Sequence, residues 1–394
     1  MKICMVAASL AGGGAERALL DTATLLMERG HHVRVLTFED ERSDAYVVPQ
    51  GLSRVALGVP GRSGNRLRGI WNNLRRMARL RAEIGRLRPD VVVSYLTRTN
   101  IICLLALLGT GRAVVATEHN VATLNDAPMQ RMWRVLRRLL YPRMAQVVVV
   151  STGLARQYAW LNADKISVIH NLLPTSRGAE PETFDFLSDG VRYIVGMGRL
   201  EPEKGFDRLV EAFHLVAKDC AGWKLLIVGE GSLRPALARL VASLGLEGRV
   251  ELPGRVSNPR SLFRRCDLFA LSSESEGFGL VLIEAMSVGL PVISFDCDFG
   301  PREIITPDIS GILVPSGDVQ ALARAISTLA KDDALRARLA QGGLASMDRF
   351  APHEIIDRWE AMLRRVAGQG IALREVHSPT GAADRMGASE RNVL

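Results

Sequence analysis

One stretch decides how the second half of the chain folds: Ser272-Ser273-Glu274-Ser275-Glu276-Gly277-Phe278-Gly279-Leu280-Val281-Leu282-Ile283-Glu284-Ala285-Met286. An apolar run, residues 266–271, ends where this stretch begins, and apolar residues recur with a helical period after its two glycines. The pattern predicts a strand, a loop and the start of a helix, with the loop at the carboxyl end of the strand. Ligands of open α/β sheets gather at that edge.

The predicted loop suits a phosphate. Backbone N–H groups of Phe278, Gly279 and Leu280 would lie at the positive end of the helix dipole. Glu276 precedes them and Glu284 follows it by eight residues. If the helix covers this interval, a rise of ~1.5 Å per residue places the two carboxylates about 12 Å apart, which is about the span of a diphosphate with a sugar ring at either end. Because carboxylates accept hydrogen bonds from sugar hydroxyls, the spacing predicts a nucleotide-sugar site.

Two cations flank another loop of the second half. Residues 191–198 form an apolar run typical of a strand, and Arg199 and Lys204 follow it, just before a helical pattern that starts at Phe206. Two cations at the end of a strand can clamp a diphosphate leaving group. Residues 250–256 predict a further strand, which ends at Val256.

Three motifs now stand together: Glu276 and Glu284 as E-x7-E, residues 198–207 as G-R-L-x-P-E-K-G-x-D, and residues 300–305 as G-P-x-E-I-I. The E-x7-E spacing alone also suits two solvated acids on a helix. Because all three motifs occur in one chain, it resembles the retaining glycosyltransferases of family 4, which have the GT-B fold. The third motif is similar to one found in bacterial N-acetylhexosamine transferases of glycan assembly.

The resemblance implies an α/β protein with two Rossmann-like, doubly wound domains that face each other across a cleft. It also implies an enzyme that moves a sugar, such as an N-acetylhexosamine, from a UDP-sugar to an acceptor hydroxyl on a lipid-linked glycan in cell-surface polysaccharide or glycan assembly. The family retains the anomeric configuration, which is commonly assigned to attack on the same face assisted by the leaving phosphate. No protein nucleophile, metal or other cofactor is then expected.

The family's site residues carry over onto this sequence. The catalytic set is Glu276, His119, Arg199 and Lys204. The donor-binding set is Gly13, Gly14, Arg199, Lys204, Val256, Glu276, Gly277, Phe278, Gly279, Leu280 and Glu284. By this resemblance Glu276 would hold the transferring sugar, Glu284 the ribose, and Val256 would be the backbone neighbour of the base.

The first half opens with an apolar run, residues 1–10, which we interpret as a strand and not a secretory signal because a glycine turn and a helical pattern follow at once. With a second strand at residues 32–38, this is also how a dinucleotide-binding unit begins. That fingerprint needs a third glycine where the chain has Arg17, so a nicotinamide cofactor is disfavoured. Gly13 and Gly14 match the family's donor loop, and they equally suit a tight turn with positive φ.

His119 follows an apolar, β-branched run, residues 113–117, that predicts a strand. It would therefore lie at the carboxyl edge of the first sheet. A lone histidine is most often structural. In the family resemblance, however, the strand-end Glu-His-Asn matches the position that faces the donor sugar.

Two segments of the first half predict basic amphipathic helices, residues 65–88 and 129–143. Nine arginines lie between Arg62 and Arg88 against one acid, and five between Arg131 and Arg143 against none, with apolar residues at helical spacing. Core-packed helices with solvated edges would explain either segment alone. Because there are two, we expect a peripheral contact with an anionic membrane surface, close to the lipid-linked acceptor.

Composition bounds the remaining possibilities. At 394 residues, the chain suits two domains of ~150–200 residues. We assign residues 1–174 to an acceptor-binding domain and 190–350 to a nucleotide-sugar-binding domain, with a final helix, 351–367, that returns to the first domain and a disordered tail, 368–394. Net charge is +8, and 44 of the 50 basic residues are Arg, which favours phosphate or anionic lipid partners.

Five scattered cysteines suit buried thiols in a reducing cytoplasm, and no apolar run approaches the ~18–20 residues of a membrane span. We therefore expect a cytoplasmic protein, peripheral on the inner face of the cytoplasmic membrane, with no nucleic-acid partner. Two other functions fit part of the pattern. A GT-B sugar-nucleotide epimerase would turn over donor without acceptor, and a phospholipid-binding module would leave the second half without a purpose.

Overall fold

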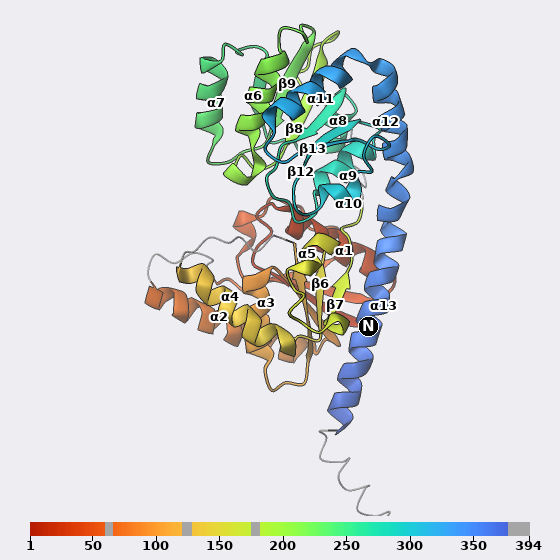
Figure 1. Ribbon diagram of the computed structural model, residues 1–394. Coiled ribbons are helices and arrows are strands. Elements are labelled where there is room, and N and C mark those ends of the chain that lie inside the picture. The colour runs from red at the N-terminus through yellow and green to blue at the C-terminus, as the bar shows by residue number, and fades with distance from the viewer. Residues whose placement is uncertain (60–65, 120–127, 175–181, 377–394) are drawn as a thin grey trace, which may run out of the picture. The chain divides into compact units, whose positions relative to one another are not determined.

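The computed structural model describes residues 1–59, 66–119, 128–174 and 182–376. They form two compact units (Figure 1). Unit 1 comprises residues 1–150, 157–169 and the chain from His353 onward, and unit 2 comprises residues 151–156 and 170–352. Each unit holds one parallel sheet.

The sheet of unit 1 has the order β3-β2-β1-β4-β5-β6-β7, and every pairing is parallel. Its strands are nearly continuous apolar runs because helices cover both faces of such a sheet. In chain order they are β1 (Lys2–Ala7), β2 (His32–Thr37), β3 (Ser53–Ala56), β4 (Val91–Tyr95), β5 (Ala113–Glu118), β6 (Gln146–Val149) and β7 (Ile166–Val168).

The helices of unit 1 are α1 (Gly14–Glu28), α2 (Arg66–Leu87), α3 (Thr97–Leu107), α4 (Pro128–Leu140) and α13 (Pro352–Val376, in this unit from His353), with short turns η1 (Glu41–Ser43), η2 (Tyr141–Arg143) and η3 (Ala163–Lys165). Helices α2 and α4 both pack against α3 (Figure 1). Helix α13 is tied to the end of α1 by Arg29, whose guanidinium pairs with Asp357 at 2.7 Å, and by His31, whose Nε2 lies 2.9 Å from Glu360.

The sheet of unit 2 has the order β10-β9-β8-β11-β12-β13, again parallel throughout. Its strands are β8 (Arg192–Met197), β9 (Trp223–Val228), β10 (Val250–Gly254), β11 (Leu268–Leu271), β12 (Val292–Asp296) and β13 (Ile312–Pro315). Counted from its own first strand, each sheet therefore contains the doubly wound order 3-2-1-4-5-6, to which the sheet of unit 1 adds a seventh strand. The predicted α/β class is confirmed.

The helices of unit 2 are α5 (Thr152–Arg156), α6 (Phe206–Val216), α7 (Arg234–Ser243), α8 (Pro259–Phe263), α9 (Leu280–Met286), α10 (Pro301–Ile304), α11 (Val319–Lys331) and α12 (Asp333–Ala345), with η4 (Pro202–Lys204) and η5 (Met347–Phe350). One apolar core joins the inner faces of α6 and α11 to the central strands, with Phe213, Leu322 and Phe295 fully buried in it. This core fixes the positions of the strand ends, and the loops that follow them carry the candidate site.

The segment boundaries differ from those predicted. The compact units place residues 151–156 and 170–174 in unit 2, whereas the sequence assigned them to the first domain. The final helix runs to Val376, so the predicted end at 367 is wrong, since residues 368–376 continue α13. The rest of the predicted disordered tail, 377–394, lies outside the described residues. Within the described residues, no helix combines the length and apolar character needed to cross a membrane.

Candidate functional site

The switch point of the second sheet lies between β8 and β11, which are neighbours although two strands separate them in sequence. Chain connections leave these two strands toward opposite sides, and the loops at their carboxyl ends form the usual ligand crevice of an open α/β sheet. The loop after β8 carries Arg199 and Lys204. The loop after β11 carries Glu276 and the glycines of the stretch quoted first.

Lys204 and Glu276 come into direct contact at this switch point. The Lys204 ammonium donates to Glu276 Oε1 at 2.5 Å, and both side chains are largely shielded from solvent. The Ser273 hydroxyl donates to the same oxygen at 2.7 Å. The structure thus brings together two predicted site residues that lie 72 positions apart.

Further bonds hold the two loops together. The Ser272 hydroxyl donates to the Lys204 carbonyl at 2.9 Å, and the Glu274 amide donates to the Glu203 carbonyl at 3.0 Å. Gly205 has φ +56, and a Cβ at this position would overlap the Ser272 carbonyl oxygen. Only glycine therefore allows the β8 loop to approach the β11 loop this closely.

Arg199 pairs with a different acid. Its guanidinium donates to Glu203 at 2.9 Å and its side chain is 62% exposed. An exposed i,i+4 ion pair of this kind contributes little to stability, about 0.3–0.5 kcal/mol. The side chain is consequently held loosely and is available to an anion at the loop.

Helix α9 begins at Leu280, as the sequence predicts, with Gly279 as its N-cap at φ +97. The 12 Å estimate assumed a helix from Glu276 to Glu284, and that assumption is wrong, because residues 276–279 form a loop and the helix begins only at Leu280. Glu284 lies inside α9 and is 6% exposed. A carboxylate so deeply buried requires polar partners.

The ring of Phe278 anchors the loop that follows β11. This ring is buried, stacks on His170 with 5.4 Å between centroids and meets Phe350 edge-on at 5.6 Å. Gly300 has φ +93, and a Cβ there would overlap the Phe278 carbonyl oxygen. The aromatic side chain thus fixes the loop, while the backbone of Phe278 remains the part that a ligand could use.

The segments 151–156 and 170–174 brace the same loop, a role that the sequence did not predict. The Ser151 hydroxyl donates to the Gly277 carbonyl at 2.9 Å. Glu303 accepts the backbone N–H groups of Thr152 and Gly153 at 2.8 and 2.9 Å and lies 3.2 Å from His170 Nε2. Burial alone would raise the pKa of Glu303, but these hydrogen bonds lower it to about 2.

Glu303 belongs to the G-P-x-E-I-I motif, which was the one signal in the sequence for this contact. Its partners lie about 130–150 positions earlier, so no local pattern could pair them.

Val256 follows β10, two strands from the switch point on the same sheet, and is half-buried. The donor-binding residues predicted in the second half therefore all belong to unit 2.

In unit 1, His119 follows β5 and is buried against Tyr95. The two rings stack with 5.3 Å between centroids, and neither imidazole nitrogen has a hydrogen-bond partner in the part of the chain that the structure describes. Burial lowers the pKa of His119 to about 4. The ring is neutral at pH 7 and retains one donor and one acceptor nitrogen.

The residue before it, Glu118, is the centre of a buried polar network. It accepts hydrogen bonds from the hydroxyls of Thr97 and Tyr141 and from the amide of Asn100, the first and last at 2.9 and 3.0 Å. Burial raises the pKa of Glu118, and these donors oppose that rise. The network ties α3 and η2 to the end of β5 and so fixes the backbone from which His119 projects.

The glycine loop after β1 differs from the predicted tight turn. Gly13 is extended, with φ −155, and caps α1, while Gly14 is the first helical residue. The left-handed residue is Gly12, with φ +99. The requirement for positive φ thus falls one residue earlier than predicted.

Among the described residues, no group of three or more His, Cys, Asp or Glu side chains is placed to hold a metal ion.

Comparison with known proteins identifies the family. Residues 12–177 match the family described as Glycosyltransferase Family 4, and residues 182–345 match the family described as Glycosyl transferases group 1. The chain is a family 4-like glycosyltransferase. One relative of this glycosyltransferase is the Campylobacter jejuni GalNAc-alpha-(1->4)-GalNAc-alpha-(1->3)-diNAcBac-PP-undecaprenol alpha-1,4-N-acetyl-D-galactosaminyltransferase, 27% identical over 93% of this chain and 99% of that protein.

Another relative is a lipopolysaccharide core biosynthesis glycosyltransferase of Rhizobium meliloti, 32% identical over 57% of this chain and 66% of that protein. Two solved structures share the fold. Anabaena HepE in complex with UDP-glucose has a TM-score of 0.76 at 22% identity, covering 93% of this chain and 100% of that one. Sucrose-phosphate synthase from Thermosynechococcus elongatus has a TM-score of 0.79 at 18% identity, covering 93% and 99%. The predicted GT-B fold is confirmed.

Proposed function

We propose that this glycosyltransferase moves a sugar from a UDP-sugar to an acceptor hydroxyl on a lipid-linked glycan, with retention of the anomeric configuration. The observation that carries the proposal is the contact between Lys204 and Glu276 at the switch point of the second sheet. The related N-acetylgalactosaminyltransferase, whose name includes a diphospho-undecaprenol glycan, supports an N-acetylhexosamine donor and a lipid-linked acceptor. The UDP-glucose complex of HepE supports the nucleotide.

The charges of the site suit a departing diphosphate. The Lys204 ammonium has three donors and gives one to Glu276, which leaves two for phosphate oxygens. Arg199, exposed on the same loop, adds a second cation, and the amides at the start of α9 add neutral donors. These groups would stabilise the negative charge that grows on the diphosphate as the glycosidic bond breaks.

The two glutamates would divide the remaining tasks. Glu276 accepts two hydrogen bonds at Oε1, from Lys204 and Ser273, so its Oε2 is available to hydroxyls of the transferring sugar. Glu284 would bind the ribose, and Val256 would lie beside the base. His119, a neutral ring, would face the sugar, and Gly13 and Gly14 would border the donor.

The reaction balances without a protein nucleophile. The bond between the anomeric carbon and the diphosphate oxygen breaks, and a bond from the acceptor oxygen to the same carbon forms on the same face. The proton of the acceptor hydroxyl passes to the leaving phosphate oxygen, so UDP departs with it. We propose that no metal or cofactor takes part.

The same proposal includes a peripheral membrane contact through α2 and α4. The carboxyl-terminal half of α2 is core, with Leu80 and Ile84 fully buried, whereas Trp71 near its start is 61% exposed. The exposed apolar side chains of the two helices recur at helical spacing: Ile70, Trp71 and Leu74 on α2, and Met132, Val135 and Leu139 on α4. Arginines border both faces, which suits insertion at an anionic bilayer surface.

A transfer assay tests the function. UDP-N-acetylhexosamines and UDP-glucose are incubated with an undecaprenyl-diphosphate-linked oligosaccharide, and UDP release and product are followed, with the anomeric configuration read by NMR coupling constants. We expect an α-linked product from an α-linked donor. Turnover of donor without acceptor into an epimer would contradict transfer, and an inverted product would contradict retention.

A further inference from the structure

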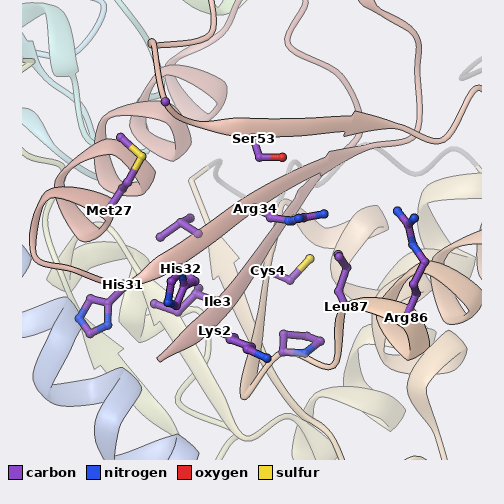
Figure 2. Close-up of a pocket in the computed structure, with 13 residues that line it drawn as sticks. Lys2, Ile3, Cys4, Met27, His31, His32, Arg34, Ser53, Arg86 and Leu87 are labelled. Atoms are coloured by element: carbon purple, nitrogen blue, oxygen red, sulfur yellow. The ribbon is translucent and has the colours of Figure 1, made fainter.

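A cavity lies within unit 1, at the amino-terminal edge of its sheet (Figure 2). Its volume is about 570 Å³, and it is lined by the first residues of β1, β2 and β3, the end of α1 and the end of α2. His119 follows the carboxyl end of β5, so this cavity lies at the opposite edge of the same sheet. A volume of ~300–1,000 Å³ is typical of small-molecule sites.

Strand register assembles one wall of this cavity. Cys4, Arg34 and Ser53 are directly paired across β1, β2 and β3. Because side chains two residues apart point to the same face of a strand, Lys2 and His32 extend that face toward the strand ends. Arg34 approaches the cavity from the sheet in this way (Figure 2).

The lining is cationic. Lys2, Arg34 and Arg86 contribute three full positive charges, His32 contributes an imidazole ring, and no Asp or Glu belongs to the lining. Of the acids nearby, Glu83 pairs with Arg86 at 2.7 Å and Asp90 accepts the Lys2 backbone N–H at 2.8 Å. Glu360 pairs with His31, which also lines the cavity.

Helix α2 ends at this edge, and the carbonyls at a helix end carry about half a negative charge. The two full positive charges of Lys2 and Arg34 alone exceed that partial charge. The acid Glu83 is already neutralised by Arg86, so Lys2 and Arg34 remain uncompensated by any ion pair among residues that the structure describes. Uncompensated cations that line a concave wall focus a positive potential inside it.

We propose that this cavity binds a small phosphate-bearing anion, at a site separate from the nucleotide-sugar site. A diphosphate or phosphate ester suits the lining, since its oxygens accept hydrogen bonds from lysine and arginine side chains such as Lys2 and Arg34, and Ser53 adds a hydroxyl donor. The phosphate could belong to a soluble ester or to a lipid headgroup. The proposal does not depend on the identity of the sugar donor.

Inorganic pyrophosphate is the first probe. Titration calorimetry is done in a Lys204→Ala background, which weakens phosphate binding at the loop after β8. The seven histidines are labelled for NMR, and the His32 resonance is assigned with His32→Gln. We expect pyrophosphate to shift the His32 resonance and Arg34→Gln to weaken binding about tenfold or more, since one charged hydrogen bond is lost.

Two variants control for charge and folding. Arg34→Lys keeps the charge and should recover most of the affinity, while Arg358→Gln removes an exposed arginine of α13 outside the cavity and should leave the affinity unchanged. If Arg34→Gln does not fold, Arg86→Gln on the exposed side of α2 serves in its place. Equal affinity in Arg34→Gln (or Arg86→Gln) and Arg358→Gln would overturn the proposal.

Vesicles distinguish the two sources. If the ligand is a lipid headgroup, phosphatidic acid vesicles should shift the same His32 resonance and compete with pyrophosphate. If the ligand is soluble, pyrophosphate should shift the His32 resonance and the vesicles should not. A His32 resonance that neither probe shifts would mean that the cavity binds no phosphate.

Discussion

Replacing Lys204 by Ala would separate the chemical role of this side chain from its structural role. The ammonium and the Glu276 carboxylate are 18% and 11% exposed, so their contact is largely shielded from solvent. A hydrogen bond to a charged group contributes about 1.5–3 kcal/mol. In a unit of this size, each kcal/mol lowers Tm by about 2–4 °C, so Lys204→Ala should leave a folded but less stable protein.

The effect on turnover should be larger than that loss of stability suggests. If Lys204 stabilises the departing diphosphate, its removal should lower kcat by ~10²-fold or more, which corresponds to about 2.7 kcal/mol of transition-state stabilisation. UDP release from a UDP-sugar in the presence of acceptor measures kcat, and thermal unfolding measures stability. Lys224→Ala is the matched control, since Lys224 pairs with Glu251 at 2.8 Å in the same unit, and its kcat should be unchanged.

The double variant Lys204→Ala/Glu276→Gln distinguishes two roles of Lys204: pairing with Glu276 and stabilising the departing diphosphate. It removes both charges, so no carboxylate is left buried without its ammonium, and stability should recover toward that of the parent. If pairing with Glu276 were the whole role of Lys204, turnover in the double variant would equal that of Glu276→Gln alone. We expect it to stay ~10²-fold lower. Near-normal turnover in folded Lys204→Ala would also refute the assignment.

Three further predictions follow from named contacts. Glu284→Ala should weaken UDP binding about tenfold or more in titration calorimetry, whereas Glu276→Ala should impair transfer with UDP still bound; equal losses of UDP affinity would contradict this division. Hydrogen bonds lower the pKa of Glu303 from 4.5 to about 2, so its stabilisation is present above pH 4.5 and is lost as the pH falls toward 2. Thermal unfolding should show a smaller decline over that interval in Glu303→Gln, and identical declines would remove Glu303 as the cause. Trp71→Ser should reduce flotation with anionic vesicles, while Leu215→Ser, which removes an exposed apolar side chain of unit 2, should not; equal flotation of both variants would count against membrane insertion.

Local periodicity predicted much of this fold. The helix that starts at Leu280 follows from the apolar spacing after Gly279, and the strand ends that carry Lys204 and Glu276 follow from apolar runs that stop at polar residues. Two loops that follow neighbouring strands of a doubly wound sheet must lie side by side, so their contact was accessible to sequence reasoning. The direct bond between the two side chains required the structure.

Non-local contacts and burial were not accessible in the same way. The bond from Thr152 to Glu303 joins positions 151 residues apart, and neither segment carries a pattern that requires the other. In α2 the same helical period continues from Trp71 to Ile84, although the first is exposed and the second is buried. A period identifies a face of a helix, and only the packing neighbour determines how far along the helix that face is covered.

The two sheets share one strand order, yet their switch points differ in chemistry. In unit 2 the loops after the first and fourth strands of the sheet place a charged pair, Lys204 and Glu276, at the edge. In unit 1 the corresponding loops carry Gly12, at φ +99, and Leu96, at φ +71. A non-glycine residue at such a positive φ costs about 1–3 kcal/mol, and Leu96 is held there by the hydrogen bond that its backbone N–H donates to the Thr117 carbonyl at 3.0 Å. The loops of unit 2 also contain positive-φ glycines, Gly205 and Gly279, but they add the charged pair, which is why the proposed diphosphate chemistry belongs to unit 2.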